Sequence, residues 1–363
     1  MTQAVEKQAI ILGGGLFGRL MAVSLARRGL EVTVYEASPS ERIDAAAHVA
    51  AAMLAPLAES AVTESSVVAM GVYSIPRWRE LISSLKSKVF FQELGTLILW
   101  HRQDIHEANR FKKLLEKTSL EIPGFEPLRT IDQVGIHSLE PSLGSQFHQA
   151  YYLPQEGQLD NRQLLESLLQ EMKTLGVVMH WNAPKELSEF ESNKEWVIDC
   201  RGLGAKKSLT TLRGIRGEVV RLYAPEVKLQ RPVRLMHPKY PIYIAPKEND
   251  IYVIGATEIE TDDRSEISLR SLLELLSAAY TVHSGFAEAR VLEVLANCRP
   301  TMPDNLPVIK VIKKNMLAIN GLYRHGFMIS PAILDATLEY MFEKTTHLIE
   351  KLNIHLENSN TCA

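Results

Sequence analysis

The chain has 363 residues, of which 46% are hydrophobic and 23% are charged, and its formal net charge is −3. This composition is that of an ordinary folded globular protein and excludes a disordered chain. So small a net charge gives no electrostatic reason to expect nucleic acid or an anionic membrane as a partner, and the length predicts two domains, because one hydrophobic core rarely serves so long a chain.

The start of the chain shows no targeting pattern. It lacks the basic region and the apolar stretch of a signal peptide, and no apolar run in the chain is long enough to span a bilayer. The cysteines, Cys200, Cys298 and Cys362, form no closely spaced pair, which argues against a disulfide framework and against a zinc site. We therefore expect a cytoplasmic protein with no transmembrane segment and no bound metal.

The first predicted elements form a strand, a helix and a second strand. The apolar run 9–12 is typical of a buried strand, and the pattern of 16–28 predicts a helix that Gly29 can end. The alternating residues 31–35 predict the second strand, which Glu36 follows directly. This is the context that a dinucleotide-binding motif requires.

Three glycines, Gly13, Gly15 and Gly18, lie between the first strand and the helix with the spacing G-x-G-x-x-G. In such a motif the first glycine permits the tight turn, the second lets a pyrophosphate approach the backbone, and the third lets the helix pack closely on the sheet. The helix N-terminus then holds the anion. Glu36 can accept hydrogen bonds from a ribose diol and repels a 2′-phosphate, which favours FAD or NAD over NADP.

The next stretch mixes helices and short strands. Residues 45–53 are rich in small side chains, which fits either a helix end packed against a flat ligand or a tightly packed structural helix. Residues 75–86 predict an amphipathic helix, 90–100 a strand, a turn and a strand, and 110–117 a charged surface helix.

A second group of strand and helix signals follows. Asp160 or Asn161 can cap a helix over 162–175, after which a strand is expected. Residues 196–200 predict another buried strand, and it leads into a glycine turn at Gly202, a second place where backbone can approach a ligand closely.

The remaining segments predict a second sheet and then a return to the first. The stretches 214–225, 240–247 and 250–260 alternate with a period near two, as in antiparallel strands, and 268–279 predicts a helix. The fold class is therefore α/β, α+β overall, with a Rossmann-like domain around a central parallel sheet and a second domain with a mixed or antiparallel sheet. The predicted boundaries are 1–85, 150–215 and 295–350 for the first domain, 86–149 and 216–294 for the second, and 351–363 for a C-terminal tail.

Several motifs, taken in chain order, resemble those of one enzyme family. They are the glycine motif with Glu36, AMLAP at 52–56, RGEVVRL at 216–222, YIAP at 243–246, VIGATEIE at 253–260, CRPTMPDNLPVI at 298–309 and NGLYRHGFMISP at 320–331. Together they look like the glycine oxidases of thiamine biosynthesis, which belong to the D-amino-acid oxidase and sarcosine oxidase group of FAD-dependent amine oxidases. The resemblance covers most of the chain.

The resemblance implies a fold and a reaction. The first domain would bind FAD, and the antiparallel sheet of the substrate domain would cover the flavin. The implied reaction is the oxidation of a small amino acid, glycine above all, to its imine, with a hydride passing to flavin N5. Dioxygen would reoxidise the flavin and give hydrogen peroxide, and the glycine imine would supply thiamine thiazole synthesis.

The resemblance also implies the site residues. Arg299 matches the arginine that grips the substrate carboxylate, Tyr243 a tyrosine that hydrogen-bonds the same carboxylate, and Arg324 an arginine beside the flavin. The helix expected after Ser330 or Pro331 would point its N-terminus at the flavin. The implied FAD contacts are Gly13, Gly15, Leu16, Phe17, Gly18, Glu36, Ala52, Met53, Gly202, Gly321, Arg324, His325, Gly326, Phe327 and Met328.

The residues by themselves leave other interpretations open. Arg299 fits a surface salt bridge, Tyr243 a half-buried sheet position, and His325 a packed structural histidine. Cys298 fits a small buried residue better than a covalent flavin tether, because its strand neighbour Arg299 would face the opposite side. For the whole chain the alternatives are a D-amino-acid or sarcosine oxidase or dehydrogenase of the same fold and, less favoured, an FAD-binding subunit without turnover. A homo-oligomer is left open.

Overall fold

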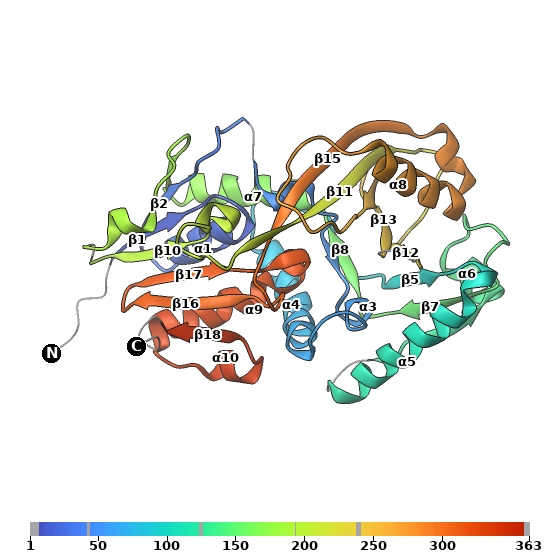
Figure 1. The fold of residues 1–363 in the computed structure, drawn as a ribbon, viewed down its shortest axis with the longest axis horizontal. Helices are drawn as coiled ribbons and strands as arrows, with labels where there is room; N and C mark the ends of the chain where they lie inside the picture. The colour runs from blue at the N-terminus through green and yellow to red at the C-terminus, as the bar shows by residue number, and fades with distance from the viewer. Residues whose placement is uncertain (1–6, 42–43, 123–125, 193, 237–240, 359–363) are drawn as a thin grey trace.

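The computed structural model describes residues 7–41, 44–122, 126–192, 194–236 and 241–358. Two large sheets lie side by side, one on the left and one on the right of Figure 1. The N- and C-terminal thirds of the chain build most of the left-hand sheet, and the middle builds the right-hand one. The predicted fold class, with a mainly parallel sheet and a mainly antiparallel one, is confirmed.

The left-hand sheet has seven strands within the described residues, and all neighbouring pairs are parallel except β16 with β17. In spatial order they are β18 (His355–Asn358), β16 (Val308–Lys313), β17 (Met316–Asn320), β10 (Trp196–Asp199), β1 (Gln8–Leu12), β2 (Glu31–Tyr35) and β9 (Val178–His180). The carboxyl ends of β1, β10 and β17 meet at one edge, where ligands bind in open sheets of this kind.

Apolar helices cover this sheet and share one core with it. They are α1 (Leu16–Arg27), α4 (Ser65–Ser83), α7 (Asn161–Thr174) and α9 (Gly326–Leu338). The Asp160 side chain caps α7 by accepting hydrogen bonds from the amides of Arg162 and Gln163. Gly29, at φ +83°, follows the end of α1, a left-handed conformation that glycine adopts without strain.

The right-hand sheet has eight described strands, antiparallel except for β12 beside β5. In spatial order they are β15 (Arg290–Thr301), β11 (Arg213–Tyr223), β14 (Ile251–Gly255), β13 (Ile242–Pro246), β12 (Val233–Leu235), β5 (Thr96–Leu99), β7 (Gln149–Leu153) and β6 (Arg129–Asp132). The helices α5 (Ile105–Glu121), α6 (Gln133–Leu139) and α8 (Leu269–Val282) accompany it.

Shorter elements join the two halves. They are α2 (Ala46–Val49), α3 (Pro56–Glu59) and a small antiparallel sheet of β3 (Met53–Leu54), β8 (Gly157–Leu159) and β4 (Phe91–Gln92). The short helix α10 (His347–Lys351) belongs to the core of the left-hand half. The strands expected within 90–100 exist, but β4 and β5 belong to different sheets. Domain boundaries stay a prediction, and β18, from the expected tail, pairs with β16.

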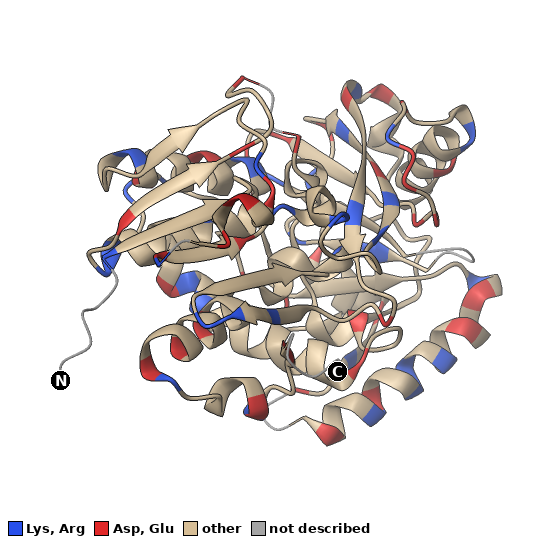
Figure 2. Cartoon of the chain, turned by 60° about the vertical axis from the view of Figure 1, so that its left-hand side comes forward, with Lys and Arg blue, Asp and Glu red and all other residues tan. Residues whose placement is uncertain are grey.

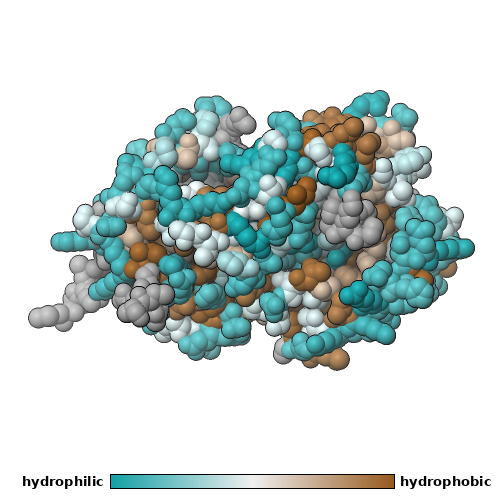
Figure 3. Space-filling model, in the orientation of Figure 1, coloured by the Kyte–Doolittle hydropathy of each residue, from teal (hydrophilic) through white to brown (hydrophobic). Residues whose placement is uncertain are grey.

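The surface carries both charge signs, intermixed over the view of Figure 2. Exposed apolar side chains gather at the upper right of Figure 3, over α8 and the start of β15. They include Leu269, Leu273, Tyr280, Val291 and Leu292. Within the described ranges no helix combines the length and the apolar character that crossing a lipid bilayer needs.

Candidate functional site

One large cavity lies where the two sheets meet and draws its walls from both. From the left-hand half come the turn after β1, Glu36, the segment 45–53, Gly202 and residues 322–328, and from the right-hand half Tyr243 and Arg299. Every site residue expected from the sequence lines this cavity except Gly18 and Gly321. The tertiary structure thus brings together residues that are about 300 positions apart in the chain.

The glycines after β1 have different steric surroundings. Gly13 has φ +97°, and a Cβ there would lie 2.7 Å from the carbonyl oxygen of Cys200. A Cβ at Gly18 would lie 1.9 Å from the carbonyl oxygen of Gly13, so the turn and the helix approach too closely for any side chain. At Gly15 the nearest atom would be 3.8 Å away, which leaves open space in front of the helix.

The space in front of α1 suits a dinucleotide. The helix has no side-chain cap and no acidic residue in its first turn, so nothing there repels an anion. The Glu36 carboxylate is fixed at the end of β2 by the amides of Gly14, at 2.6 Å, and Ser38, at 2.8 Å. An anion site at the helix and a carboxylate at the next strand end fit the pyrophosphate and the ribose of FAD.

Helix α9 begins at Gly326, so the expectation of a start after Ser330 or Pro331 is wrong. Pro331 lies inside the helix, where its missing N–H leaves the carbonyl of Phe327 without its helical partner. The indole Nε1 of Trp78, on α4, donates to that carbonyl oxygen at 2.6 Å and satisfies it. The N-terminus of α9, which has no acidic residue in its first turn, therefore opens into the cavity through Gly326, Phe327 and Met328.

Arg299, on β15, is a half-buried cation that faces the cavity. Its guanidinium donates to the carbonyl oxygens of Thr257, at 3.1 Å, and Arg216, at 3.4 Å. No carboxylate of the described residues lies within 4.0 Å of it. Burial, helped by the neighbouring Arg324, lowers the pKa of Arg299 to about 10. A half-buried guanidinium with unused donors is a favourable receptor for a carboxylate.

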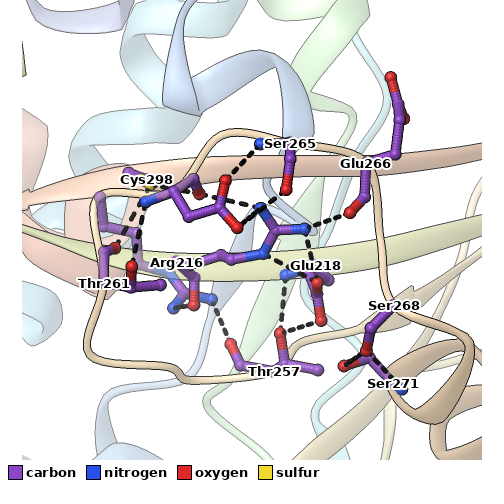
Figure 4. Close-up of polar contacts among 11 residues, drawn as sticks. Arg216, Glu218, Thr257, Thr261, Ser265, Glu266, Ser268, Ser271 and Cys298 are labelled. Carbon is purple, nitrogen blue, oxygen red and sulfur yellow. Dashed lines mark hydrogen bonds and ion pairs between the residues drawn. The ribbon is translucent and has the colours of Figure 1, made fainter.

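Behind Arg299 lies a buried polar network that the sequence did not indicate (Figure 4). The Arg216 guanidinium contacts the Glu218 carboxylate at 2.8 Å and donates to main-chain oxygens of Asp263 and Glu266. The hydroxyl of Thr257 donates to the other Glu218 oxygen at 3.0 Å. Arg216 and Thr257 supply the two carbonyls that hold Arg299, so the network orients that guanidinium.

Arg324 also lines the cavity, but its guanidinium is already paired with two carboxylates. Its Nε lies 3.0 Å from Glu59 Oε2, and its Nη1 donates to Glu258 Oε2 at 2.6 Å. Glu59 accepts a further hydrogen bond from the hydroxyl of Tyr243 at 3.1 Å, and Glu258 one from the hydroxyl of Tyr323. Burial alone would raise the pKa of Glu59, but Arg324 and its other cationic neighbours lower it to about 2. These two acids were not expected from the sequence, where only Glu59 in an apolar stretch offered a weak signal.

The surroundings of His325 and Cys298 fit the structural roles that the sequence favoured for them. His325 is buried, and burial lowers its pKa to about 4, so the ring is neutral at physiological pH. The Cys298 sulfur turns toward the loop carbonyls of Thr261, at 3.5 Å, and Asp263, at 3.2 Å, as Figure 4 shows. Arg299, which lines the cavity, donates instead to the carbonyls of Thr257 and Arg216.

A family model described as "DAO: FAD dependent oxidoreductase" matches residues 8–337. The chain belongs to this family. It is therefore an FAD-dependent oxidoreductase, as the glycine motif and the resemblance predicted. When bound, FAD supplies the redox chemistry, and the chain's residues supply binding and orientation.

Relatives within the family are similar over most of this chain. A protein of Rhizobium etli named "Putative thiamine biosynthesis oxidoreductase ThiO" is 38% identical over 330 residues, which are 89% of this chain and 93% of that relative. A "Bifunctional protein ThiO/ThiG" of Nostoc sp. is 25% identical over 90% of this chain, and the match spans only 51% of that longer protein.

Solved structures have the same fold. Glycine oxidase from Geobacillus kaustophilus superposes with a TM-score of 0.76 at 19% identity, covering 94% of this chain and 96% of that one. Iminodiacetate oxidase from Chelativorans sp. gives a TM-score of 0.80 at 18% identity, over 96% of this chain and 99% of that one. At these identities the likeness shows the fold alone.

A second buried acid, Glu156, holds in place the short helix that carries Glu59. Glu156 Oε1 accepts a hydrogen bond from the amide of Ala58 at 2.7 Å, and Arg234 donates to the carbonyl of Ala58. These contacts fix the short helix α3 that presents Glu59 to the cavity. Burial raises the pKa of Glu156 to about 7. Because this value exceeds the ordinary 4.5, Glu156 contributes stability below pH 4.5 that is lost as the pH rises through 7.

Glu156→Gln should remove this pH dependence, because glutamine keeps the acceptor for Ala58 and has no proton to lose. The stability of the variant minus that of the wild type should rise between pH 4.5 and 8 by up to about 3 kcal/mol. Thermal unfolding across this range measures it, with Glu166→Gln, an exposed carboxylate on α7, as the control. Parallel curves for wild type and Glu156→Gln would contradict the prediction.

Proposed function

We propose that the protein oxidises a small amino acid, with glycine as the favoured substrate, to its imine, and that dioxygen is reduced to hydrogen peroxide. The observation that carries the proposal is Arg299, a half-buried cation without a carboxylate partner among the described residues, in the wall of the cavity that fits FAD. The names of the relatives, a putative thiamine biosynthesis oxidoreductase and bifunctional ThiO/ThiG proteins, support a role in thiamine thiazole synthesis.

The chain's own residues would orient the substrate. Arg299 would hold the carboxylate through two parallel hydrogen bonds, and the Thr257 and Arg216 carbonyls would keep that guanidinium in place. The Tyr243 hydroxyl donates to Glu59 in this structure, so a contact with the substrate requires that hydroxyl to turn away from Glu59. Orientation of this kind lowers the barrier by removing freedom before the reaction.

Of the described residues that line the cavity, Glu59 and His325 are the two whose basicity matters here, and neither is a strong base. Glu59, with a pKa of about 2, is too weakly basic to take a proton from an ammonium group, and the neutral His325 is buried. The amino group of the substrate would therefore reach the site neutral or lose its proton to water. Orientation and redox chemistry, without an acid–base pair, are what this arrangement can supply.

A peroxide-coupled screen of the FAD-loaded protein against glycine, sarcosine and D-amino acids tests the proposal. We expect glycine to give the highest kcat/KM. Preference for sarcosine or a D-amino acid would favour the alternative oxidases of the same fold. Substrate-dependent flavin bleaching without peroxide would indicate a dehydrogenase, and no bleaching with any amino acid would leave an FAD-binding subunit without turnover. A homo-oligomer and a cytoplasmic location stay predictions.

A further inference from the structure

The two guanidinium groups of the cavity, those of Arg299 and Arg324, differ in their hydrogen-bond and ion-pair partners. Arg299 contacts only main-chain carbonyls in the described structure, whereas Arg324 lies between the carboxylates of Glu59 and Glu258. Both cations are half-buried, and the charge of Arg324 contributes to lowering the pKa of Arg299. One carboxylate of a substrate therefore has one receptor, and a second carboxylate would have to compete with Glu59 or Glu258 for Arg324.

The charges of this group balance before a substrate enters. Arg299 and Arg324 carry two positive charges, and Glu59 and Glu258 carry two negative ones. A monocarboxylate adds one negative charge, which lies on Arg299, the cation without a carboxylate partner among the described residues. A dicarboxylate adds a second negative charge beside two fixed carboxylates, in a partly desolvated place where like charges repel strongly.

A second pocket of about 310 Å³ adjoins the cavity and shares Glu258, Tyr323 and Arg324 with it. Arg299 does not line this pocket, whereas Arg324 lines both the pocket and the cavity. The other charged residues among the described lining, Glu64 and Asp304, are both acidic. A substituent that extends from the substrate past Arg324 would enter these surroundings.

We propose that Glu258 is a specificity-determining residue, which excludes a second carboxylate from Arg324 and favours substrates whose substituent on the amine is neutral or cationic. The inference rests on the proposed function and narrows its substrate class to monocarboxylic amino acids. Glu258 is suited to this role because its side chain is 36% exposed, borders both spaces and holds Arg324 and Tyr323 at once.

The test compares three N-substituted glycines of similar size in the FAD-loaded enzyme. They are N-ethylglycine, which is neutral in its substituent, iminodiacetate, which adds a carboxylate, and N-(2-aminoethyl)glycine, which adds an ammonium group. For the wild type, kcat/KM for iminodiacetate should lie at least about tenfold below that for N-ethylglycine, the size expected for one charged contact. N-(2-aminoethyl)glycine should be at least as good as N-ethylglycine.

Glu258→Gln should change the two charged substrates in opposite directions relative to N-ethylglycine. The kcat/KM for iminodiacetate should rise by about tenfold or more, because the Arg324 guanidinium loses one of its two carboxylate partners. The kcat/KM for N-(2-aminoethyl)glycine should fall. Glu258→Asp keeps the charge and should keep the wild-type order. Glu260→Gln is the matched control, because this acid of the same loop is 70% exposed, pairs with Arg213 and lines neither space. A loss of activity shared equally by all three substrates would mean that Glu258 is only structural and would overturn the proposal.

A binding measurement separates this inference from the proposed function. Methoxyacetate and diglycolate are unreactive analogues with one and two carboxylates, and calorimetry on the holoenzyme gives their dissociation constants. The wild type should bind diglycolate at least about tenfold more weakly than methoxyacetate, and Glu258→Gln should close the gap. If no amino acid is oxidised, the proposed function fails and this pair of ligands still decides the inference. Equal binding of both ligands by the wild type would overturn it.

Discussion

Replacing Arg299 with alanine is expected to lower kcat/KM for amino acids on the order of 10- to 100-fold or more, because a charge-assisted hydrogen bond contributes roughly 1.5–3 kcal/mol. Arg299 is the half-buried cation of the cavity whose guanidinium meets only main-chain carbonyls within the described structure. Arg299→Lys keeps the charge but loses the two-pronged geometry, so its loss should be intermediate. Steady-state kinetics with glycine and a measurement of bound FAD give both quantities.

The FAD content of both variants should stay near that of the wild type, because Arg299 is assigned to the substrate. An amine that lacks a carboxylate should be oxidised equally well, or equally poorly, by wild type and variants. Arg213→Ala removes an arginine of the neighbouring strand that pairs with Glu260 at the surface, and it serves as the matched control. Full amino-acid oxidation by Arg299→Ala would show that the carboxylate binds elsewhere.

Gly18→Ala should damage both the fold and the binding of FAD. Its Cβ would lie 1.9 Å from the carbonyl oxygen of Gly13, and since that atom belongs to the backbone, the turn or the helix has to move. Overpacking against backbone in a dense core should cost at least about 3 kcal/mol of unfolding free energy. Chemical denaturation of the apoprotein measures the loss of stability independently of the cofactor.

Gly15→Ala should separate the two effects. Its φ of −72° is accessible to alanine, and its Cβ would meet nothing closer than 3.8 Å, so the apoprotein should unfold much like the wild type. The added methyl group would stand where the pyrophosphate approaches the helix, so FAD affinity should fall by about tenfold or more. FAD titration followed by fluorescence measures it. Normal affinity in Gly15→Ala, or a stable apoprotein for Gly18→Ala, would contradict these steric assignments.

The elements that the sequence predicted correctly are those whose causes are local. The strand, glycine turn, helix and strand of 8–36 follow from periodicity, from a left-handed turn that only glycine adopts without strain, and from the stop at Gly29. The alternating stretches of the middle became β11, β13 and β14, and these strands are buried on both faces because other elements cover the sheet. The family followed from such motifs in order, and the family match bears it out.

The start of α9 could not be predicted from its local sequence. A proline usually lies near the beginning of a helix, and by that rule Ser330 or Pro331 marked the start. The indole of Trp78, 249 residues away, satisfies the carbonyl that Pro331 leaves free, so the helix begins one turn earlier. Only packing of α4 against α9 could supply that donor.

The electrostatics of the site were decided by tertiary structure as well. Arg299 and Arg324 look equivalent in the sequence, yet one is left without a carboxylate partner among the described residues and the other is occupied by Glu59, 265 positions away, and by Glu258. The motifs of the sequence and the family resemblance predicted the residues of the cavity, and all of those named line it except Gly18 and Gly321. Which cation is free for a substrate depends on charges that meet only after folding, since Coulomb interactions act through distance in space and not along the chain.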